Sequence, residues 1–125
     1  MLNENARLWV AALRSGRYRR TTGMLHRAKG GYCCLGVACE VYIQSGGKLE
    51  KKRYPGGQVS YAGEGGILPP VVVKWLGLRI ASGAYAETSL DEVNDTRGMT
   101  FKRIADIIES EPEGLFAPPP AGGPQ

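Results

Sequence analysis

The stretch Gly30–Gln44, which reads GGYCCLGVACEVYIQ, constrains the fold more than any other part of this chain. Its run Tyr32–Leu35 is compact and apolar, which is typical of a β-strand. Gly36 interrupts the run, and four apolar residues then recur at the spacing of one helix face: Val37, Ala38, Val41 and Tyr42. A strand that turns directly into a helix buries both elements against one core. We therefore expect a packed strand and a helix from about Val37 to Ser45.

Caps and apolar stripes predict further helices. Asn3 can cap the first, which ends before Gly16, and Thr100 can cap the last. Apolar residues at helical spacing run along both: Leu8, Trp9, Ala12 and Leu13 in the first, and Phe101, Ile104, Ala105 and Ile108 in the last. Another helix begins at Pro69-Pro70, because proline suits a first helical turn, and stops at Gly77.

Turn signals predict two short hairpins. Met24–Arg27 precedes a turn and can pair with the Tyr32–Leu35 strand, and Gln58–Ala62 belongs to a second, exposed hairpin. Arg79–Thr88 is expected to be a loop of small residues. Ser89 then begins a short turn of helix, with a glutamate three residues on, as a capping box requires.

The length and composition fit one small domain. The chain has 125 residues, and an apolar content of 42% is enough for a modest core. We expect an α+β fold over residues 1–112, with about four helices around one or two short antiparallel β-hairpins. Residues 113–125 end in APPPAGGPQ and are expected to form a mobile tail, since they are rich in proline and glycine.

Apolar runs and cysteines indicate the compartment. No run of 18 apolar residues exists, and the first ten residues lack a basic start followed by an apolar segment. We therefore expect no membrane association and no standard export signal. Three cysteines, two of them adjacent, make a poor disulfide framework and favour reduced thiols in a cytoplasm.

The charges are divided unevenly along the chain. The net charge is +4, but residues 1–53 carry +8 and residues 54–125 carry −4. The two halves can pair with each other, within one fold or between subunits of a homo-oligomer. The basic half can equally form a face that attracts anions such as phosphates, or simply a solvated surface.

Residue types used in catalysis have simpler structural explanations here. Cys33, Cys34, Cys39 and His26 are potential zinc ligands or nucleophiles, but adjacent thiols point to opposite sides of a strand and thiols are often buried. We expect them to belong to the core, with no metal and no cofactor. Asp91, Glu92 and Asp95 lie where caps and turns already favour acids. No nucleotide-binding glycine loop or hydrolase motif is present, so catalysis stays open but is the less favoured function.

The basic connector GRYRRTTG is the strongest functional signal. Its arginines offer guanidinium groups to phosphate, and tyrosines offer flat faces to a base. We expect a ligand-binding site made of Arg17, Tyr18, Arg19, Arg20, Thr22 and Tyr32, completed by Asn94 and Asp95 from the second half. A small anionic ligand fits this short cluster better than a nucleic acid duplex, because the second half is acidic.

Several blocks of the chain resemble a known group of proteins. They read WVAALRSGRY, GYCCLGVACEVY, ILPPVVVKWLGL, SLDEVND and FKRIADIIESEPEGLF, and they cover most of residues 6–116. Together they resemble an uncharacterised family of small proteins from tailed phages and their bacterial hosts, prominently actinobacteria. Arg20 stands where the family has glutamine, and Val93 replaces a leucine.

The resemblance implies a phage-type accessory protein in the host bacterial cytoplasm. Such proteins commonly act by binding, and one class sequesters nucleotide-derived signals of host immunity. We therefore expect a protein that binds and sequesters a small anionic, nucleotide-derived ligand without catalysis. A module that inhibits a host protein or nucleic acid is the first alternative, and a small hydrolase or transferase acting on a nucleotide is the second.

Overall fold

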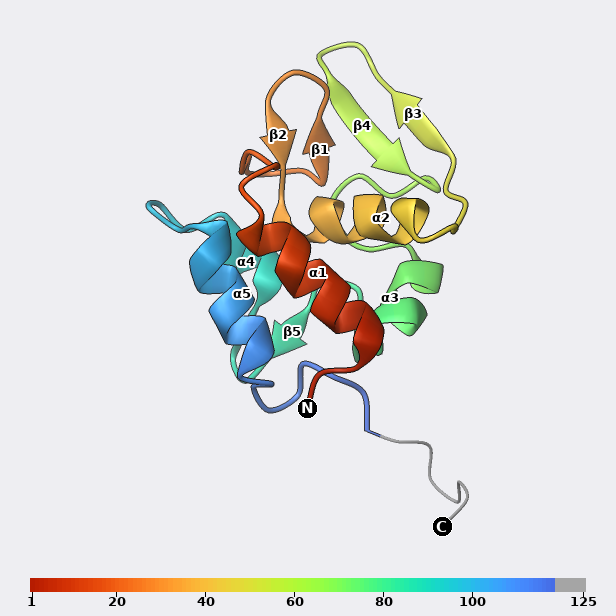
Figure 1. The fold of residues 1–125 in the computed structure, drawn as a ribbon. Helices are drawn as coiled ribbons and strands as arrows, with labels where there is room; N and C mark the ends of the chain where they lie inside the picture. The colour runs from red at the N-terminus through yellow and green to blue at the C-terminus, as the bar shows by residue number, and fades with distance from the viewer. Residues whose placement is uncertain (119–125) are drawn as a thin grey trace.

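Helix α2 (Cys34–Gln44) lies at the centre of the computed structural model, which describes residues 1–118 (Figure 1). Seven of its residues are buried: Cys34, Leu35, Gly36, Val37, Ala38, Cys39 and Val41. It packs against helices α1 (Glu4–Arg14), α3 (Pro70–Leu76) and α4 (Leu90–Asn94) and against strand β2 (Gly31–Tyr32). The described chain folds as five helices with a four-stranded and a two-stranded antiparallel sheet, so the expected α+β class is confirmed.

The start of α2 differs from the prediction. The expected strand Tyr32–Leu35 is wrong, because the strand (β2, Gly31–Tyr32) ends at Tyr32. Cys33 already caps the helix, its thiol accepting a hydrogen bond from the Gly36 N–H. Gly36 does not separate a strand from a helix, because it lies within α2. A Cβ atom at this position would lie 1.9 Å from the Leu25 carbonyl oxygen, so glycine lets the helix approach that backbone closely.

Helices α1 (Glu4–Arg14) and α5 (Phe101–Glu109) pack side by side (Figure 1). Both expected caps are confirmed: the Asn3 side chain accepts from the Ala6 N–H, and Thr100 accepts from the Arg103 N–H. The α5 stripe is buried as predicted. The α1 stripe is rotated, since the buried residues are Ala6, Trp9, Val10 and Leu13, whereas Leu8 is 45% exposed.

The two expected hairpins join in one sheet. Its strands are β1 (His26–Arg27), β2, β3 (Lys51–Arg53) and β4 (Gln58–Tyr61), in the order β2-β1-β4-β3. The second hairpin is not wholly exposed, because β4 pairs with β1 and its last three residues are buried. The Tyr61 hydroxyl donates to Glu40 on α2 at 2.6 Å, which fixes the sheet to the helix.

The remaining elements cover the other end of the molecule. Helix α3 (Pro70–Leu76) stops at Gly77, as predicted, and Gly77 adopts the left-handed conformation. The expected loop after it contains a small hairpin of β5 (Ala84–Tyr85) and β6 (Thr88–Ser89). The capping box before α4 (Leu90–Asn94) does not form, because the Ser89 hydroxyl bonds the Asp91 carboxylate instead of a backbone N–H.

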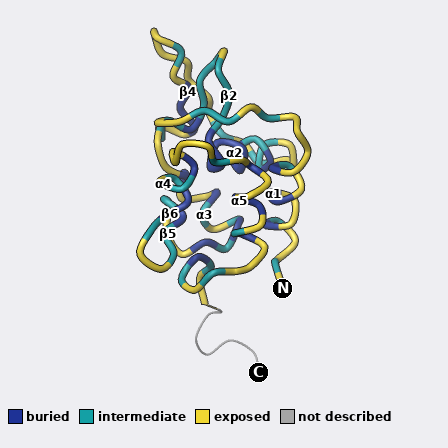
Figure 2. The backbone as a smooth tube through the Cα atoms, turned by 90° about the vertical axis from the view of Figure 1, so that its left-hand side faces the viewer, coloured by how far each residue is buried: buried dark blue, intermediate teal, exposed yellow. Residues whose placement is uncertain are grey.

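The chain stays packed beyond residue 112. Within the tail expected to be mobile, Leu115 is fully buried, its carbonyl accepts from the Arg79 N–H, and the Ala117 N–H donates to Gly77. The rest of that expected tail, 119–125, lies outside the described residues. Figure 2 shows buried backbone in the middle of the molecule and exposed hairpin tips above it. No helix within residues 1–118 has the length and apolar character needed to cross a bilayer.

Candidate functional site

The basic connector between α1 and β1 lies along strand β2. The Tyr32 N–H donates to the Arg19 carbonyl and the Thr21 N–H donates to the Tyr32 carbonyl, both at 2.8 Å. Positive φ angles at Gly16 and Gly23 turn the chain at the two ends of this segment. The connector is therefore held in place by backbone hydrogen bonds.

Asn94, the last residue of α4, and Asp95, which follows it, contact the connector. Asn94 is fully buried; its amide oxygen accepts from the Cys34 N–H at 3.0 Å and its amide nitrogen donates to the Thr21 carbonyl at 2.9 Å. Arg20 donates to the Asn94 carbonyl, and the Gly23 N–H donates to the Asp95 carboxylate. The Asn94 amide is thus occupied by protein partners and holds the connector rather than facing a ligand.

Tyr18 separates two surface hollows. The first lies between α1 and α2, has a volume of about 350 Å³, and includes Arg17 and Gln44 in its lining. The second lies between the connector and the start of α5 and has a volume of about 460 Å³. We call the second the connector hollow; its lining is Leu13, Arg14, Gly16, Tyr18, Arg20, Met99, Thr100, Phe101 and Lys102.

The connector hollow concentrates positive charge beside an aromatic ring. Arg14 is engaged by Asp106 and Glu109, but neither Arg20 nor Lys102 takes part in an ion pair among the residues that the structure describes. The α5 N-terminus adds backbone N–H groups and the positive end of the helix dipole. The Tyr18 hydroxyl is held by Gln44 at 2.9 Å. This arrangement can bind an anion next to a flat group.

Other expected ligand-binding residues lie outside this hollow. Arg17 lines the first hollow, whereas Arg19, Thr22 and Tyr32 line neither. The Tyr32 ring stacks on His26 with centroids 3.9 Å apart, and its edge contact with Tyr18 is 5.1 Å between centroids. Burial raises the Tyr32 pKa, so its hydroxyl is neutral. Of the three arginines predicted to converge, only Arg20 reaches the connector hollow.

A family model described as a domain of unknown function (DUF8296) matches residues 1–112. The chain belongs to the DUF8296 family. No curated protein and no solved structure matches it.

The cysteines of this DUF8296 chain are buried and protonated. The Cys34 thiol donates to the Leu90 carbonyl, and burial raises the Cys33 pKa to about 11. Burial also raises the pKa of Cys34 and of Cys39 well above the ordinary thiol value. A thiol is a poor nucleophile compared with a thiolate, so these residues contribute packing. Within residues 1–118, no group of three His, Cys, Asp or Glu side chains is placed to hold a metal ion.

Sequence reasoning missed Lys102 and Met99 as neighbours of the connector in this DUF8296 fold. They lie 82 and 79 positions after Arg20 and reach it only because α5 packs along α1. A signal for that packing is present in the sequence. Arg14 ends the first amphipathic helix, and Asp106 and Glu109 lie on one side of the last, where Arg14 bonds both carboxylates.

Proposed function

We propose that this protein binds and sequesters a small phosphate-bearing ligand, derived from a nucleotide, in the connector hollow and without converting it. The observation that carries the proposal is the grouping of Arg20, Lys102 and Tyr18 around one hollow at the α5 N-terminus. Guanidinium and ammonium groups bind phosphate, and a tyrosine face suits a base.

The size of the connector hollow supports a compact ligand. Its volume of about 460 Å³ falls within the range that small-molecule sites occupy. The cations stand on two elements that are both fixed, since Arg20 is bonded to Asn94 and Lys102 lies in the first turn of α5. The backbone of this site therefore needs no rearrangement to bind a ligand, and the Arg20 side chain is already held in place.

The biological setting enters through the sequence resemblance. The chain resembles small accessory proteins of tailed phages and their actinobacterial hosts. A phage benefits when such a protein sequesters a nucleotide-derived signal of host immunity. The ligand proposed here is accordingly a cyclic nucleotide or an ADP-ribose derivative. Binding by a homo-oligomer in the host cytoplasm is part of the same proposal.

Release of the bound ligand tests this function directly. The purified protein is heated, the released small molecules are identified by mass spectrometry, and affinity for the recovered nucleotide is measured by calorimetry. We expect an unchanged nucleotide and a loss of about 10- to 100-fold in affinity for Lys102→Gln, since one charge-assisted hydrogen bond is removed. Arg103→Gln is the matched control, because it removes the same charge from the next residue of α5, outside the hollow.

Three results would contradict the proposal. A nucleotide that is chemically altered on incubation indicates an enzyme. Equal losses of affinity in Lys102→Gln and Arg103→Gln show that the ligand does not bind in the connector hollow. If the thermal-shift screen detects no binding of a cyclic nucleotide or ADP-ribose derivative, and heating releases none, the protein does not sequester such ligands.

A further inference from the structure

The turns of the two β-hairpins lie side by side at one end of the molecule (Figure 1). Strands β1 and β4 pair, with Arg27 opposite Gln58, and just beyond this pair the Ala28 N–H donates to the Gly57 carbonyl at 2.7 Å. This bond links the β1–β2 turn to the β3–β4 turn. The two tips therefore form one surface.

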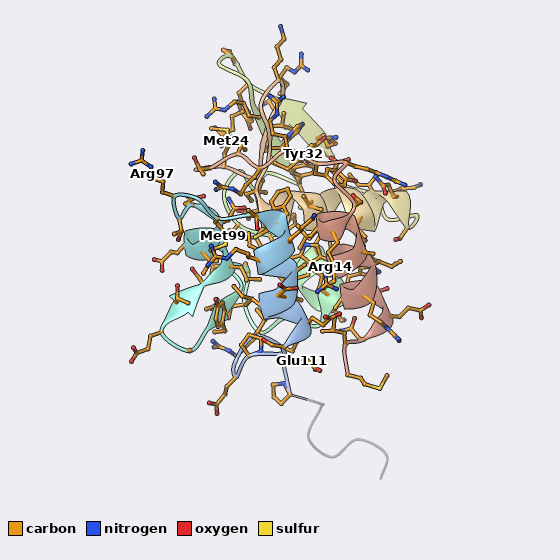
Figure 3. All side chains as sticks on the ribbon, turned by 60° about the vertical axis from the view of Figure 1, so that its left-hand side comes forward. Arg14, Met24, Tyr32, Arg97, Met99 and Glu111 are labelled. Carbon is orange, nitrogen blue, oxygen red and sulfur yellow. The ribbon has the colours of Figure 1, made fainter. Side chains whose placement is uncertain are left out.

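Between the turns lies a basic cleft with a volume of about 380 Å³. We call it the tip cleft; its lining is Arg27, Ala28, Lys29, Arg53, Tyr54, Gly56 and Gly57. No Asp or Glu in the described part of the chain lines it, and none of its three cations takes part in an ion pair there. Lys52 does not line the cleft but lies next to it, with its ammonium 5.1 Å from the centre of the Tyr54 ring. Figure 3 shows nitrogen-tipped side chains gathered over these hairpins.

Two glycines leave the space that the Arg27 side chain occupies in this cleft. A Cβ atom at Gly30 would lie 2.6 Å from the Arg27 Cδ, and one at Gly57 would lie 3.8 Å from its Cγ. The aliphatic part of Arg27 thus lies against the Gly30 backbone, in space that any side chain at Gly30 would take. The position of the Arg27 guanidinium depends on that glycine.

Protection of a sheet edge explains only part of this charge. Lysines on an edge strand such as β3 hinder pairing with other chains, and Lys51 in addition bonds Glu40 at 2.8 Å. Arg27 and Lys29, however, belong to the other hairpin, and β1 is an inner strand of the sheet. Edge protection gives no reason for cations of both hairpins to line one cleft.

We infer that the tip cleft binds the sugar-phosphate backbone of single-stranded nucleic acid. Three or four unpaired cations match a run of phosphates, and Tyr54, which is 38% exposed, offers a ring to an unstacked base. A duplex keeps its bases stacked inside and leaves such a tyrosine without a partner. The tip cleft shares no residue with the connector hollow, so this inference does not depend on the proposed function.

Fluorescence anisotropy with a labelled 12-nucleotide thymidine oligomer tests the inference. The variant Lys29→Gln/Lys52→Gln/Arg53→Gln should bind about 10-fold or more weakly at about 50 mM salt. Its slope of log affinity against log salt should be shallower by about 2, since each lost phosphate contact contributes about 0.7. The control Arg7→Gln/Lys74→Gln/Arg97→Gln removes the same charge from exposed residues elsewhere and should keep the wild-type slope.

A second variant tests geometry without changing charge. Gly30→Ala keeps every cation but displaces Arg27, and it should weaken binding of the oligomer several-fold while thermal unfolding shows a folded protein. Equal weakening by the two triple variants, or no binding of the oligomer by the wild type at about 50 mM salt, overturns the inference. Tighter binding of the matching duplex than of the single strand overturns the assignment to single strands.

Discussion

Asn94 joins three segments of the chain through one side-chain amide. Its oxygen accepts from the first N–H of α2, and its nitrogen donates to the connector and to the neighbouring Asp95 carboxylate. Every hydrogen atom and the oxygen of the amide are thus used, at a site with no exposure to solvent. Together with the backbone bonds to Tyr32, this residue fixes the connector, and with it Arg20, against the core.

Replacing Asn94 with alanine should lower the free energy of unfolding by about 2–4 kcal/mol. The Cys34 N–H and the Thr21 carbonyl would each lose a buried partner, and an unsatisfied buried polar group costs about 1–3 kcal/mol. Urea denaturation followed by circular dichroism measures the change. Asn5→Ala is the control, because it removes one partly buried bond to Trp75 and should cost about 1 kcal/mol. Equal costs in the two variants would show that Asn94 does not organise the connector.

At the scale of elements, α1 and α5 form the contact that creates the connector hollow. Arg14 closes this contact at its edge with bonds to Asp106 at 2.8 Å and to Glu109 at 3.1 Å. The Arg14 guanidinium lowers the pKa of Glu109 below its ordinary value of 4.5. The ion pair is exposed, so its contribution to stability is small and is reduced by salt.

The stability gained from this pair should depend on pH in one direction. Because the Glu109 pKa is lower in the folded state, the gain is present above the ordinary value of 4.5 and is lost as the pH falls through the folded-state pKa. The difference in unfolding free energy between the wild type and Arg14→Gln should therefore be larger at about pH 7 than at about pH 3. Urea titrations at both values measure it. If the difference in unfolding free energy between the wild type and Arg14→Gln grows toward low pH, the Arg14–Glu109 ion pair does not stabilise the fold in this way.

Helices of this fold could be predicted from the sequence more reliably than its strands. The caps at Asn3 and Thr100 and the stop at Gly77 are local signals, and all three hold in the structure. The strands have two to four residues each and are fixed by partners far away, as when Tyr61 bonds Glu40. A run of apolar residues such as CCLGVAC fits a strand or a buried helix equally well, so the sequence does not show where α2 begins.

The candidate site was predictable only in part for the same reason. The unusual composition of the connector singles it out in the sequence, and the structure brings Asn94 and Asp95 against it. Sequence could not tell that the Asn94 amide bonds the protein itself, since a buried structural asparagine and a ligand-binding one look alike. Lys102 and the tip cleft depend on which elements pack together; the charges of Arg14, Asp106 and Glu109 hint at the packing of α1 on α5, but no comparable pattern joins the two hairpin turns.

At the scale of the whole molecule, the charge division of the sequence is partly resolved within the fold. Arg14 pairs with acids of α5, and the N-terminal amino group pairs with Glu111 at 2.8 Å, so basic and acidic halves meet at one side. Arg20 and Lys102 of the connector hollow and the three cations of the tip cleft, in contrast, are left without carboxylate partners among residues 1–118. Part of the excess positive charge of the first half, carried by Arg20, Arg27, Lys29 and Arg53, therefore lies at the two surfaces proposed to bind phosphate.

The end of the described chain closes the core opposite the hairpins. Leu115 is fully buried, and the backbone around it bonds Gly77 and Arg79 in the segment after α3. The isolated bridge between Leu78 and Phe116 continues this contact. Residues 113–117 therefore belong to the folded unit, whereas residues 119–125 contain only Pro, Ala, Gly and Gln.

Two truncations should consequently behave differently. A chain that stops after Pro118 should unfold at the same urea concentration as the full chain, because no large apolar side chain is removed. A chain that stops after Pro112 loses Leu115 and the bonds to Arg79 and Gly77, and should be destabilised by at least the roughly 2–5 kcal/mol that Leu115→Ala alone costs. Leu115→Ala separates the side chain from the backbone bonds. If the two truncated chains unfold at the same urea concentration, the segment after Pro112 does not contribute to the core.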